Sequence, residues 1–172
     1  MEEIFILRHA HAEDITESQP AGNDFDRKLT EEGIEKTKKL SNCFKRLKEE
    51  TDIILSSPYR RAKETAEIFA NNLGTNIDLK TADFLSSGAS SKDIVKGLLP
   101  YSSYKKILLV GHAPDLEHFL GKLIGAERIK LKKTSMAKVS LNNNIELSGE
   151  LIWLITPKIA SKIKVKDTKE KV

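Results

Sequence analysis

The chain begins with a run of four apolar residues, Ile4-Phe5-Ile6-Leu7, which ends in Arg8 and His9. A continuous apolar run indicates a strand that is buried on both faces, as in parallel sheets. Open α/β sheets bind ligands at the carboxyl ends of such strands. The cation and the imidazole are therefore candidate site residues, although a solvated loop is the simpler interpretation for these two residues alone.

A second strongly apolar strand is predicted over Lys106–Val110, and it is followed by Gly111 and His112. Pro114 predicts the start of a helix, which Gly125 is expected to end. The chain thus places a histidine after each of two buried strands. His112 by itself would more often be a core residue than a catalytic one.

The remaining pattern predicts an α/β fold. Further strands are expected over 52–56, 77–80, 137–141 and 151–155, and helices over about 30–48, 58–72 and 91–99. Residues 151–155 form an apolar run, which predicts a buried strand. We expect a three-layer sandwich with a mostly parallel central sheet, helices on both faces and a C-terminal antiparallel hairpin. Residues 1–157 are predicted to form one domain, and 158–172 a basic tail.

Composition excludes several classes of protein. A length of 172 residues suits one domain with a substantial core. The sequence contains no apolar run of the ~20 residues that a membrane span needs, and its first residues lack the features of a signal peptide. The single cysteine, Cys43, excludes an internal disulfide and suits a reducing cytoplasm. It lies within a helical pattern, which favours a buried thiol.

The net charge of +4 is a property of the tail. Residues 158–172 contain six lysines, Asp167 and Glu170, so they carry +4 and the rest of the chain sums to zero. Aromatic residues make up 6% of the chain and the tail has none to stack on bases. We therefore expect a solvated tail and no nucleic-acid partner.

Two arginines occupy an unusual position after the strand at 52–56. Ser57 and Pro58 predict a helix start with serine as the N-cap, which places Arg60 and Arg61 in the first turn. The helix dipole is positive there, so cations are favoured only if an anion is bound nearby. We assign Arg60 to the solvated surface and Arg61 to the candidate site. Arg27 precedes the helix expected at 30–48 on the same side of the sheet, if the connection is right-handed.

These residues together suit phosphoryl transfer without a metal. An imidazole such as that of His9 can attack phosphorus and form a covalent phosphohistidine. Guanidinium groups match the oxygens of a phosphoryl group. A second imidazole can donate to the transferring group as its charge shifts.

The same segments resemble the histidine phosphatase (phosphoglycerate-mutase-like) superfamily, and within it the small SixA-type phosphohistidine phosphatases. The resemblance covers about residues 4–157 and is carried by Leu7-Arg8-His9-Ala10, Asp26–Thr30, Ser57–Ala66, Val110-Gly111-His112 and Thr134–Ala137. Three ordered motifs are specific together, although each alone is weak.

The resemblance implies that His9 is the nucleophile and that Arg8, Arg61 and His112 bind the phosphoryl group. Arg27 is a further substrate-binding candidate. No metal and no cofactor are implied. The implied partner is a phosphorylated protein of the histidine-phosphotransfer type or a small phosphorylated molecule.

Two residues depart from the family pattern, and the general acid is not identified. Ala10 replaces the usual glycine, and Lys28 replaces the usual proline. Asp83 lies near the position where larger relatives supply a glutamate. Glu13 and Asp14, in the loop that follows the first strand, are alternatives.

Three other functions remain open at this point. His9-Ala10-His11 has a spacing found in zinc sites and His112 could be a third ligand, but no further ligand is evident and the arginines would repel a cation. A non-catalytic module that binds phosphohistidine is a second alternative, which the intact histidine pair disfavours.

The third alternative is a phosphomonoesterase for small metabolites. Residues 74–105 contain only a short strand, a loop and a short helix, so little chain is available to cover the site. An open site favours a phosphoryl group carried on another protein.

Overall fold

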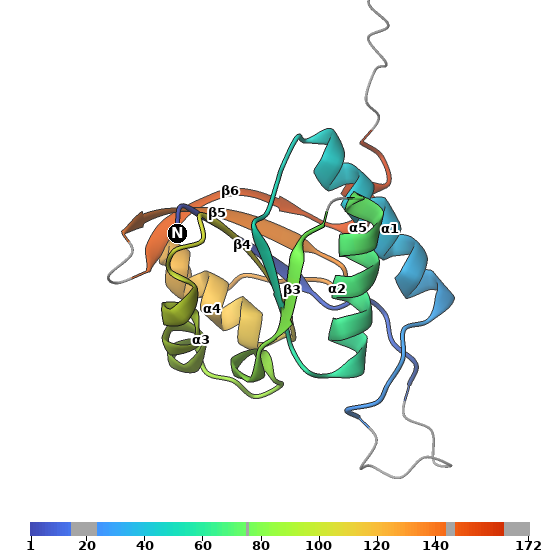
Figure 1. The fold of residues 1–172 in the computed structure, drawn as a ribbon, viewed down its shortest axis with the longest axis horizontal. Coiled ribbons are helices and arrows are strands. Elements are labelled where there is room, and N and C mark those ends of the chain that lie inside the picture. The colour runs from blue at the N-terminus through green and yellow to red at the C-terminus, as the bar shows by residue number, and fades with distance from the viewer. Residues whose placement is uncertain (15–23, 75, 144–146, 164–172) are drawn as a thin grey trace, which may run out of the picture.

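The computed structural model describes residues 1–14, 24–74, 76–143 and 147–163, and its strands form a single sheet (Figure 1). The strand order is β3-β2-β4-β1-β5-β6. The strands are β1 (Glu3–Arg8), β2 (Ile53–Ser56), β3 (Asp78–Thr81), β4 (Lys106–Gly111), β5 (Met136–Asn143) and β6 (Ser148–Ile155). The helices are α1 (Glu31–Arg46), α2 (Arg60–Leu73), α3 (Ser91–Leu98), α4 (Asp115–Ile124) and α5 (Pro157–Ala160). Short 3-10 turns cover Asp83–Leu85 and Leu99–Tyr101.

The two apolar runs form adjacent central strands. β1 and β4 are parallel, and β2 and β3 continue the parallel part of the sheet beside β4. β5 is antiparallel to β1 and is paired with β6 in the predicted C-terminal hairpin. The mostly parallel sheet with an antiparallel hairpin is thus confirmed.

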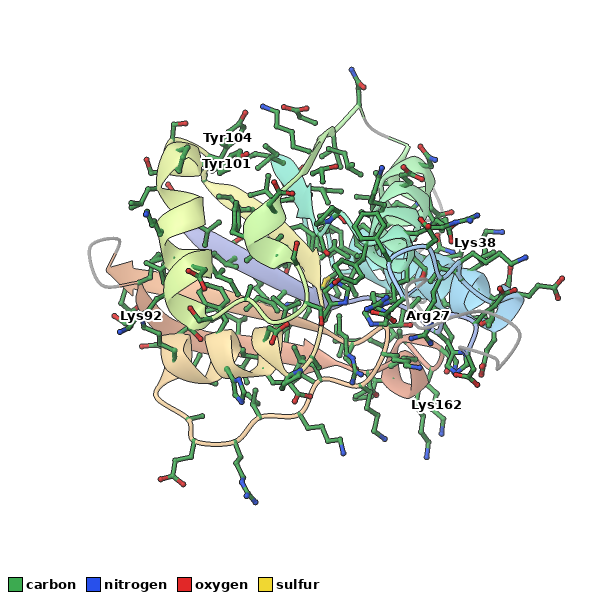
Figure 2. All side chains as sticks on the ribbon, turned by 90° about the horizontal axis from the view of Figure 1, so that it is seen from below. Arg27, Lys38, Lys92, Tyr101, Tyr104 and Lys162 are labelled. Atoms are coloured by element: carbon green, nitrogen blue, oxygen red, sulfur yellow. The ribbon has the colours of Figure 1, made fainter. Side chains whose placement is uncertain are left out.

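Alternate residues of β1 fill the cores on the two faces of the sheet. Phe5 and Leu7 pack with α1 and α2, whereas Ile4 and Ile6 pack with α3 and α4. Figure 1 shows these two pairs of helices on opposite faces of the sheet. The three-layer arrangement is confirmed, and Cys43 of α1 is fully buried as predicted. The labelled residues Tyr101 and Tyr104 lie beside α3, away from Arg27 (Figure 2).

α1 begins where its sequence predicts. The side chain of Thr30 accepts a hydrogen bond from the Gly33 amide at 3.1 Å, and acidic residues occupy the first turn. The Thr30 amide in turn donates to the His11 carbonyl at 3.0 Å. This end of α1 is therefore fixed against the segment that follows β1.

Two sequence predictions are wrong in detail. α2 begins at Arg60, two residues later than predicted, because the backbone of its N-cap Tyr59 is extended. The Ser57 hydroxyl accepts from the Tyr59 amide at 3.3 Å and also lies 2.8 Å from Nε2 of His112. β6 is not a buried strand: it lies at the edge of the sheet, and Leu151 and Ile152 are exposed. A strand with one neighbour keeps part of its apolar surface in solvent even when its sequence is continuously apolar.

The first residues of the expected tail pack against the domain. Ala160 of α5 is buried, and the Ile163 carbonyl accepts a hydrogen bond from Arg46 of α1 at 2.6 Å. Residues 164–172 lie outside the described residues, as do 15–23 of the expected first loop and 144–146 of the hairpin turn. In the described part of the chain, no helix combines the length and the hydropathy that crossing a membrane requires.

Candidate active site

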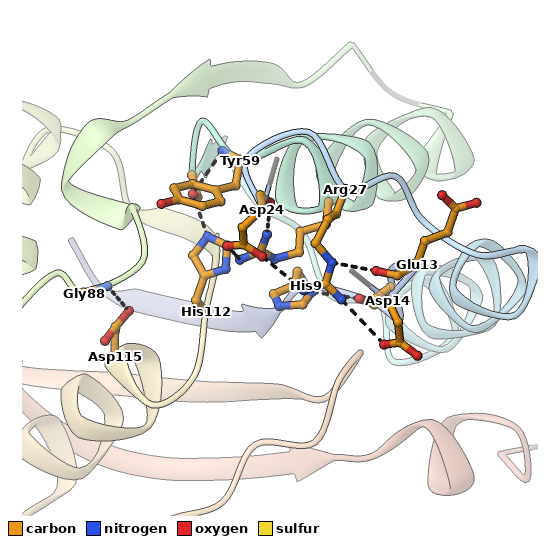
Figure 3. A network of polar contacts seen from close by, with 12 residues as sticks. His9, Glu13, Asp14, Asp24, Arg27, Tyr59, Gly88, His112 and Asp115 are labelled. Carbon is orange, nitrogen blue, oxygen red and sulfur yellow. Dashed lines mark hydrogen bonds and ion pairs between the residues drawn. The ribbon is translucent and has the colours of Figure 1, made fainter. Parts of the chain in front are cut away.

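The two parallel central strands bring His9 and His112 together. Arg8 of β1 is in register with Gly111 of β4, and the His9 amide donates to the Gly111 carbonyl at 2.9 Å. The ring centroids of the two histidines lie 5.1 Å apart. His9 is 7% exposed and His112 is 2% exposed, so both imidazoles are buried at the carboxyl edge of the sheet (Figure 3).

The hydrogen bond of His9 determines which ring nitrogen is free. Its Nδ1 lies 2.7 Å from the carbonyl oxygen of Ala10. Because a carbonyl oxygen only accepts, Nδ1 carries the proton and Nε2 of the neutral ring retains its lone pair. Burial, opposed by this hydrogen bond and aided by His112, Arg61 and Arg8, lowers the pKa of His9 to about 3. The ring is therefore neutral near pH 7.

His112 is held by contacts that the sequence did not predict. Its Nε2 lies 2.8 Å from the Ser57 hydroxyl, and the Tyr59 ring packs edge-on against it at 4.9 Å. Its Nδ1 is buried and has no hydrogen-bond partner among the described residues. Burial, with Arg61 and Arg8 nearby, lowers the pKa of His112 to about 4. A neutral second imidazole with an unused nitrogen can therefore meet a ligand between the two rings.

Two arginines adjoin the histidines, as the sequence predicts. Arg61 lies in the first turn of α2 and is 5% exposed, whereas Arg60 is exposed and paired with Glu64. Arg8 is half-buried, and it donates through Nη1 to the Leu131 carbonyl at 2.7 Å. The Nε atoms of Arg8 and Arg61 are both buried without a partner in the described structure. Unpaired buried donors are costly, so an anionic ligand that accepts from them would be stabilised.

Asp24 occupies the other donors of Arg61. Its carbonyl accepts from Nη1 at 2.6 Å, and its carboxylate accepts from Nη2 at 3.2 Å. The same carboxylate accepts from Arg27 at 3.1 Å, which places Arg27 beside the site through Asp24 (Figure 3). Although burial opposes the effect, hydrogen bonds and charge from Arg27 and Arg61 lower the pKa of Asp24. An ionised carboxylate thus lies against the Arg61 guanidinium.

None of the three predicted acids contacts the histidines. Asp83 is exposed on a 3-10 turn, and no hydrogen bond or ion pair joins it to the site within the described residues. Glu13 pairs with Lys28 at 3.3 Å, and Asp14 is exposed at 3.8 Å from Arg27. Figure 3 shows Glu13 and Asp14 beyond Arg27, on the side away from His112.

A buried threonine fixes the residue after His9. The Thr65 hydroxyl accepts from the Ala10 amide at 3.0 Å and donates to the Arg61 carbonyl at 2.6 Å. The Thr65 hydroxyl therefore connects the segment that follows β1 with the first turn of α2. Ala10 replaces the usual glycine without strain, because it is not among the residues with positive φ. The sequence contained one signal for Thr65, its place four residues after Arg61 on the helix.

The connection before β5 closes one side of the site. Thr134 has φ +61°, a strained value for a β-branched residue, and its amide lies 3.2 Å from the carbonyls of Arg8 and His9. Its hydroxyl and that of Ser135 are buried without partners among the described residues. Strained backbone of this kind is often found at functional sites.

The histidines do not form a metal-binding cluster in the described residues. His11 turns toward Thr30, with Nδ1 3.3 Å from the hydroxyl. No group of three histidine, cysteine or acidic side chains suited to a metal ion occurs in this part of the chain. The geometry instead offers one nucleophilic nitrogen surrounded by cations, which suits attack on a phosphorylated group.

Comparison with known proteins agrees with this chemistry. A sequence profile of the histidine phosphatase superfamily (branch 1) matches residues 4–85. The chain is 26% identical to phosphohistidine phosphatase SixA of Escherichia coli strain K12, over 90% of this chain and 94% of that protein.

Solved structures share the fold. The structure of the protein histidine phosphatase SixA complexed with tungstate has a TM-score of 0.80 and 23% identity, over 91% of this chain and 97% of that one. The alpha-ribazole phosphatase from Shigella flexneri has a TM-score of 0.66 and 16% identity, over 90% of this chain and 96% of that one. The fold is therefore common to phosphatases of proteins and of small molecules.

Proposed function

The chain belongs to the histidine phosphatase superfamily, and from that premise we propose that it hydrolyses phosphohistidine on a protein through a covalent intermediate at His9. The observation that carries the proposal is the free Nε2 of a neutral, buried His9. This nitrogen adjoins His112 and two arginines whose Nε atoms have no partner among the described residues.

In the first step, the Nε2 lone pair of His9 attacks phosphorus. A bond forms between Nε2 and phosphorus while the bond from phosphorus to the leaving group breaks, and that electron pair departs with the leaving group. Arg8 and Arg61 donate to the phosphoryl oxygens as their charge shifts. The Ala10 carbonyl accepts from Nδ1 and so stabilises the positive charge that develops on the ring.

In the second step, water attacks the phosphohistidine. The oxygen of water bonds to phosphorus, the bond between phosphorus and Nε2 breaks, and its electron pair returns to the ring. The products are neutral His9 and phosphate, which retains both protons of the water and then ionises. The enzyme is thereby restored without any other reactant.

A phosphohistidine substrate suits the weak proton donors of this site. When its second ring nitrogen is protonated, phosphohistidine leaves as neutral imidazole and needs no acid. An alkoxide leaving group would need one. The Asp24 carboxylate accepts from Arg61, but its pKa is lowered and it is ionised. In the described part of the chain, no hydrogen bond or ion pair joins the predicted acids Asp83, Glu13 and Asp14 to either histidine.

Hydrolysis of a small phosphorylated metabolite is the second candidate. It is favoured by the shared fold with alpha-ribazole phosphatase. In that function His112 would donate a hydrogen bond from Nδ1 to the phosphoryl group, and the leaving alkoxide would take its proton from water. The proposed function differs in requiring no donor.

Rapid quenching tests the proposal. The protein is mixed with a histidine-phosphotransfer domain carrying labelled phosphohistidine, quenched, and assayed for acid-labile, base-stable label. We expect label on His9 in the unmodified protein, and neither label nor turnover in His9→Ala. His118→Ala, which replaces an exposed histidine on α4, should retain both label and turnover. Near-normal turnover by His9→Ala would refute the mechanism.

A chelator tests the metal hydrolase alternative. We propose that the two arginines supply the positive charge that a metal ion would otherwise provide. Full turnover after treatment with EDTA is the expected result. Loss of turnover that only zinc or manganese restores would favour a metal site.

A further inference from the structure

A basic groove adjoins the site on the Arg8 side. It has a volume of about 650 Å³ and is formed by α1, the connection between α4 and β5, and α5. Seven of its ten lining residues are cations and none is acidic. Besides Arg8 these are Lys36, Lys39, Lys130, Lys132, Lys133 and Lys158. Figure 2 places Lys162, which follows α5, on the same side of the molecule as Arg27.

Few acidic side chains balance the positive charge of the basic groove. Among the described residues, only Lys36 of the six lysines has an ion pair, with Glu32 at 2.7 Å. Lys133 is half-buried, and burial together with Arg27 and Arg8 lowers its pKa. Like charges repel one another unless an anion is present, so an anionic ligand would relieve this repulsion.

Resting on the proposed function, we propose that the basic groove binds an acidic segment of the phosphorylated protein. Arg8 belongs both to the groove and to the phosphoryl site, so one partner can reach His9 and the groove together. Two of the six lysines lie on α1, three on the connection between α4 and β5 and one on α5, and their ammonium groups are flexible point charges. Such charges suit carboxylates spread over a protein surface better than a single fixed phosphate.

The lining disfavours a nucleic acid. Its non-cationic members are Thr156, Pro157 and Ser161, so no aromatic side chain is present for bases to stack on. Stacking on aromatic rings contributes much of the affinity for single strands. Apart from Arg8, every cation is a lysine, whereas bidentate arginine contacts are typical of base recognition.

Binding of a probe peptide tests the groove independently of turnover. A fluorescent oligoglutamate peptide is titrated with the unmodified protein, with Lys39→Glu/Lys132→Glu and with Lys92→Glu/Lys122→Glu. Both variants reverse two exposed lysines, but the second pair lies on α3 and α4, away from the groove. We expect salt-sensitive binding that weakens about tenfold in the groove variant and less than about twofold in the control.

Equal weakening in the two variants, or no binding by the unmodified protein, would overturn the proposal. An oligonucleotide of the same net charge provides the second probe. If it binds the groove more tightly than the peptide does, the groove is a nucleic-acid site and the proposal is wrong.

Kinetics separate failure of the groove from failure of the proposed function. With a phosphohistidine protein that carries an acidic surface, the groove variant should lose about tenfold in kcat/KM, mainly through KM. The loss with p-nitrophenyl phosphate should be several-fold smaller. If the unmodified protein hydrolyses no phosphohistidine protein, the proposed function fails, while peptide binding still decides the groove. Equal losses on both substrates would show that the lysines act on the reaction centre and not on docking.

Discussion

The two buried imidazoles make the folded state sensitive to acid. Their pKa values of about 3 for His9 and about 4 for His112 lie below the ordinary value of 6.5. At pH values between the folded and the unfolded pKa of each histidine, the unfolded chain binds more protons than the folded chain. The free energy of unfolding therefore falls as the pH falls below 6.5. At pH 5 each histidine should lower the free energy of unfolding by about 2 kcal/mol relative to neutral pH.

Urea unfolding at pH 7.5 and pH 5 measures this effect. The loss of stability between these two pH values should be about 2 kcal/mol smaller in His112→Asn than in the unmodified protein. His118→Asn provides the control, since His118 is exposed and should leave the loss unchanged. An equal loss in His112→Asn and the unmodified protein would mean that His112 is not held neutral by the fold.

We expect Asp24 to compete with the phosphoryl group for Arg61, since its carboxylate already accepts from the guanidinium. Replacement of Asp24 by asparagine keeps a side chain of similar shape but removes the negative charge that faces the Arg61 guanidinium. We expect the inhibition constant of inorganic phosphate for Asp24→Asn to fall about threefold, because the pair is partly exposed and so moderate in strength. Asp14→Asn, at a more exposed carboxylate, should change the constant less. A weaker inhibition by phosphate in Asp24→Asn would show that Asp24 supports anion binding.

Close packing determines one residue of α1. A side chain at Gly33 would overlap the carbonyl oxygen of His11, which also accepts from the Thr30 amide. Helix propensity alone predicts that Gly33→Ala is stabilising. The overlap predicts the opposite, a loss on the order of 1–3 kcal/mol, since this segment connects α1 to the residues after His9. Chemical denaturation decides the sign, with Glu35→Ala on the exposed face of α1 as control. An increase in stability for Gly33→Ala would contradict this account.

Elements with strong local signals were predictable from the sequence. The apolar runs of β1 and β4, the Thr30 cap and the glycine after α4 each encode their structure within a few residues. The start of α2 was predicted two residues too early, because Tyr59 has an extended backbone that Ser57-Pro58 does not encode. The contact of the Ser57 hydroxyl with His112, 55 residues away, was not predictable from a local pattern either. The exposure of β6 depends on its edge position, which local apolarity does not encode.

The candidate site was predictable to the same extent. Two histidines after parallel strands must meet if the strands are adjacent, and the structure brings them together. The contacts of Asp24 and Thr65 depend on how separate segments pack, and the only local signal was the spacing of Thr65 from Arg61. The chemical roles of His9, Arg8, Arg61 and His112 stay predictions that the proposed variants test.

Within the described residues, the segment between α2 and β4 contains no long insertion that could cover the site. Between α2 and β4, the described residues contain β3, α3 and two 3-10 turns, of which α3 packs on the face opposite α1. A substrate carried on another protein can therefore approach the carboxyl edge of the sheet. A small ester would have few groups to hold it there, because enzymes use contacts remote from the reacting atoms to orient their substrates.

We accordingly expect a protein phosphohistidine to exceed aliphatic phosphomonoesters in kcat/KM, with activated aryl phosphates between them. Imidazole leaves without a proton donor, an aryl oxide needs little assistance, and an alkoxide needs the most. The measurement is a direct competition at neutral pH between a phosphohistidine domain and a panel of sugar phosphates and phosphoglycerates. If any small ester is hydrolysed more efficiently than every phosphohistidine protein tried, the leaving-group argument fails and the metabolite phosphatase is the better assignment.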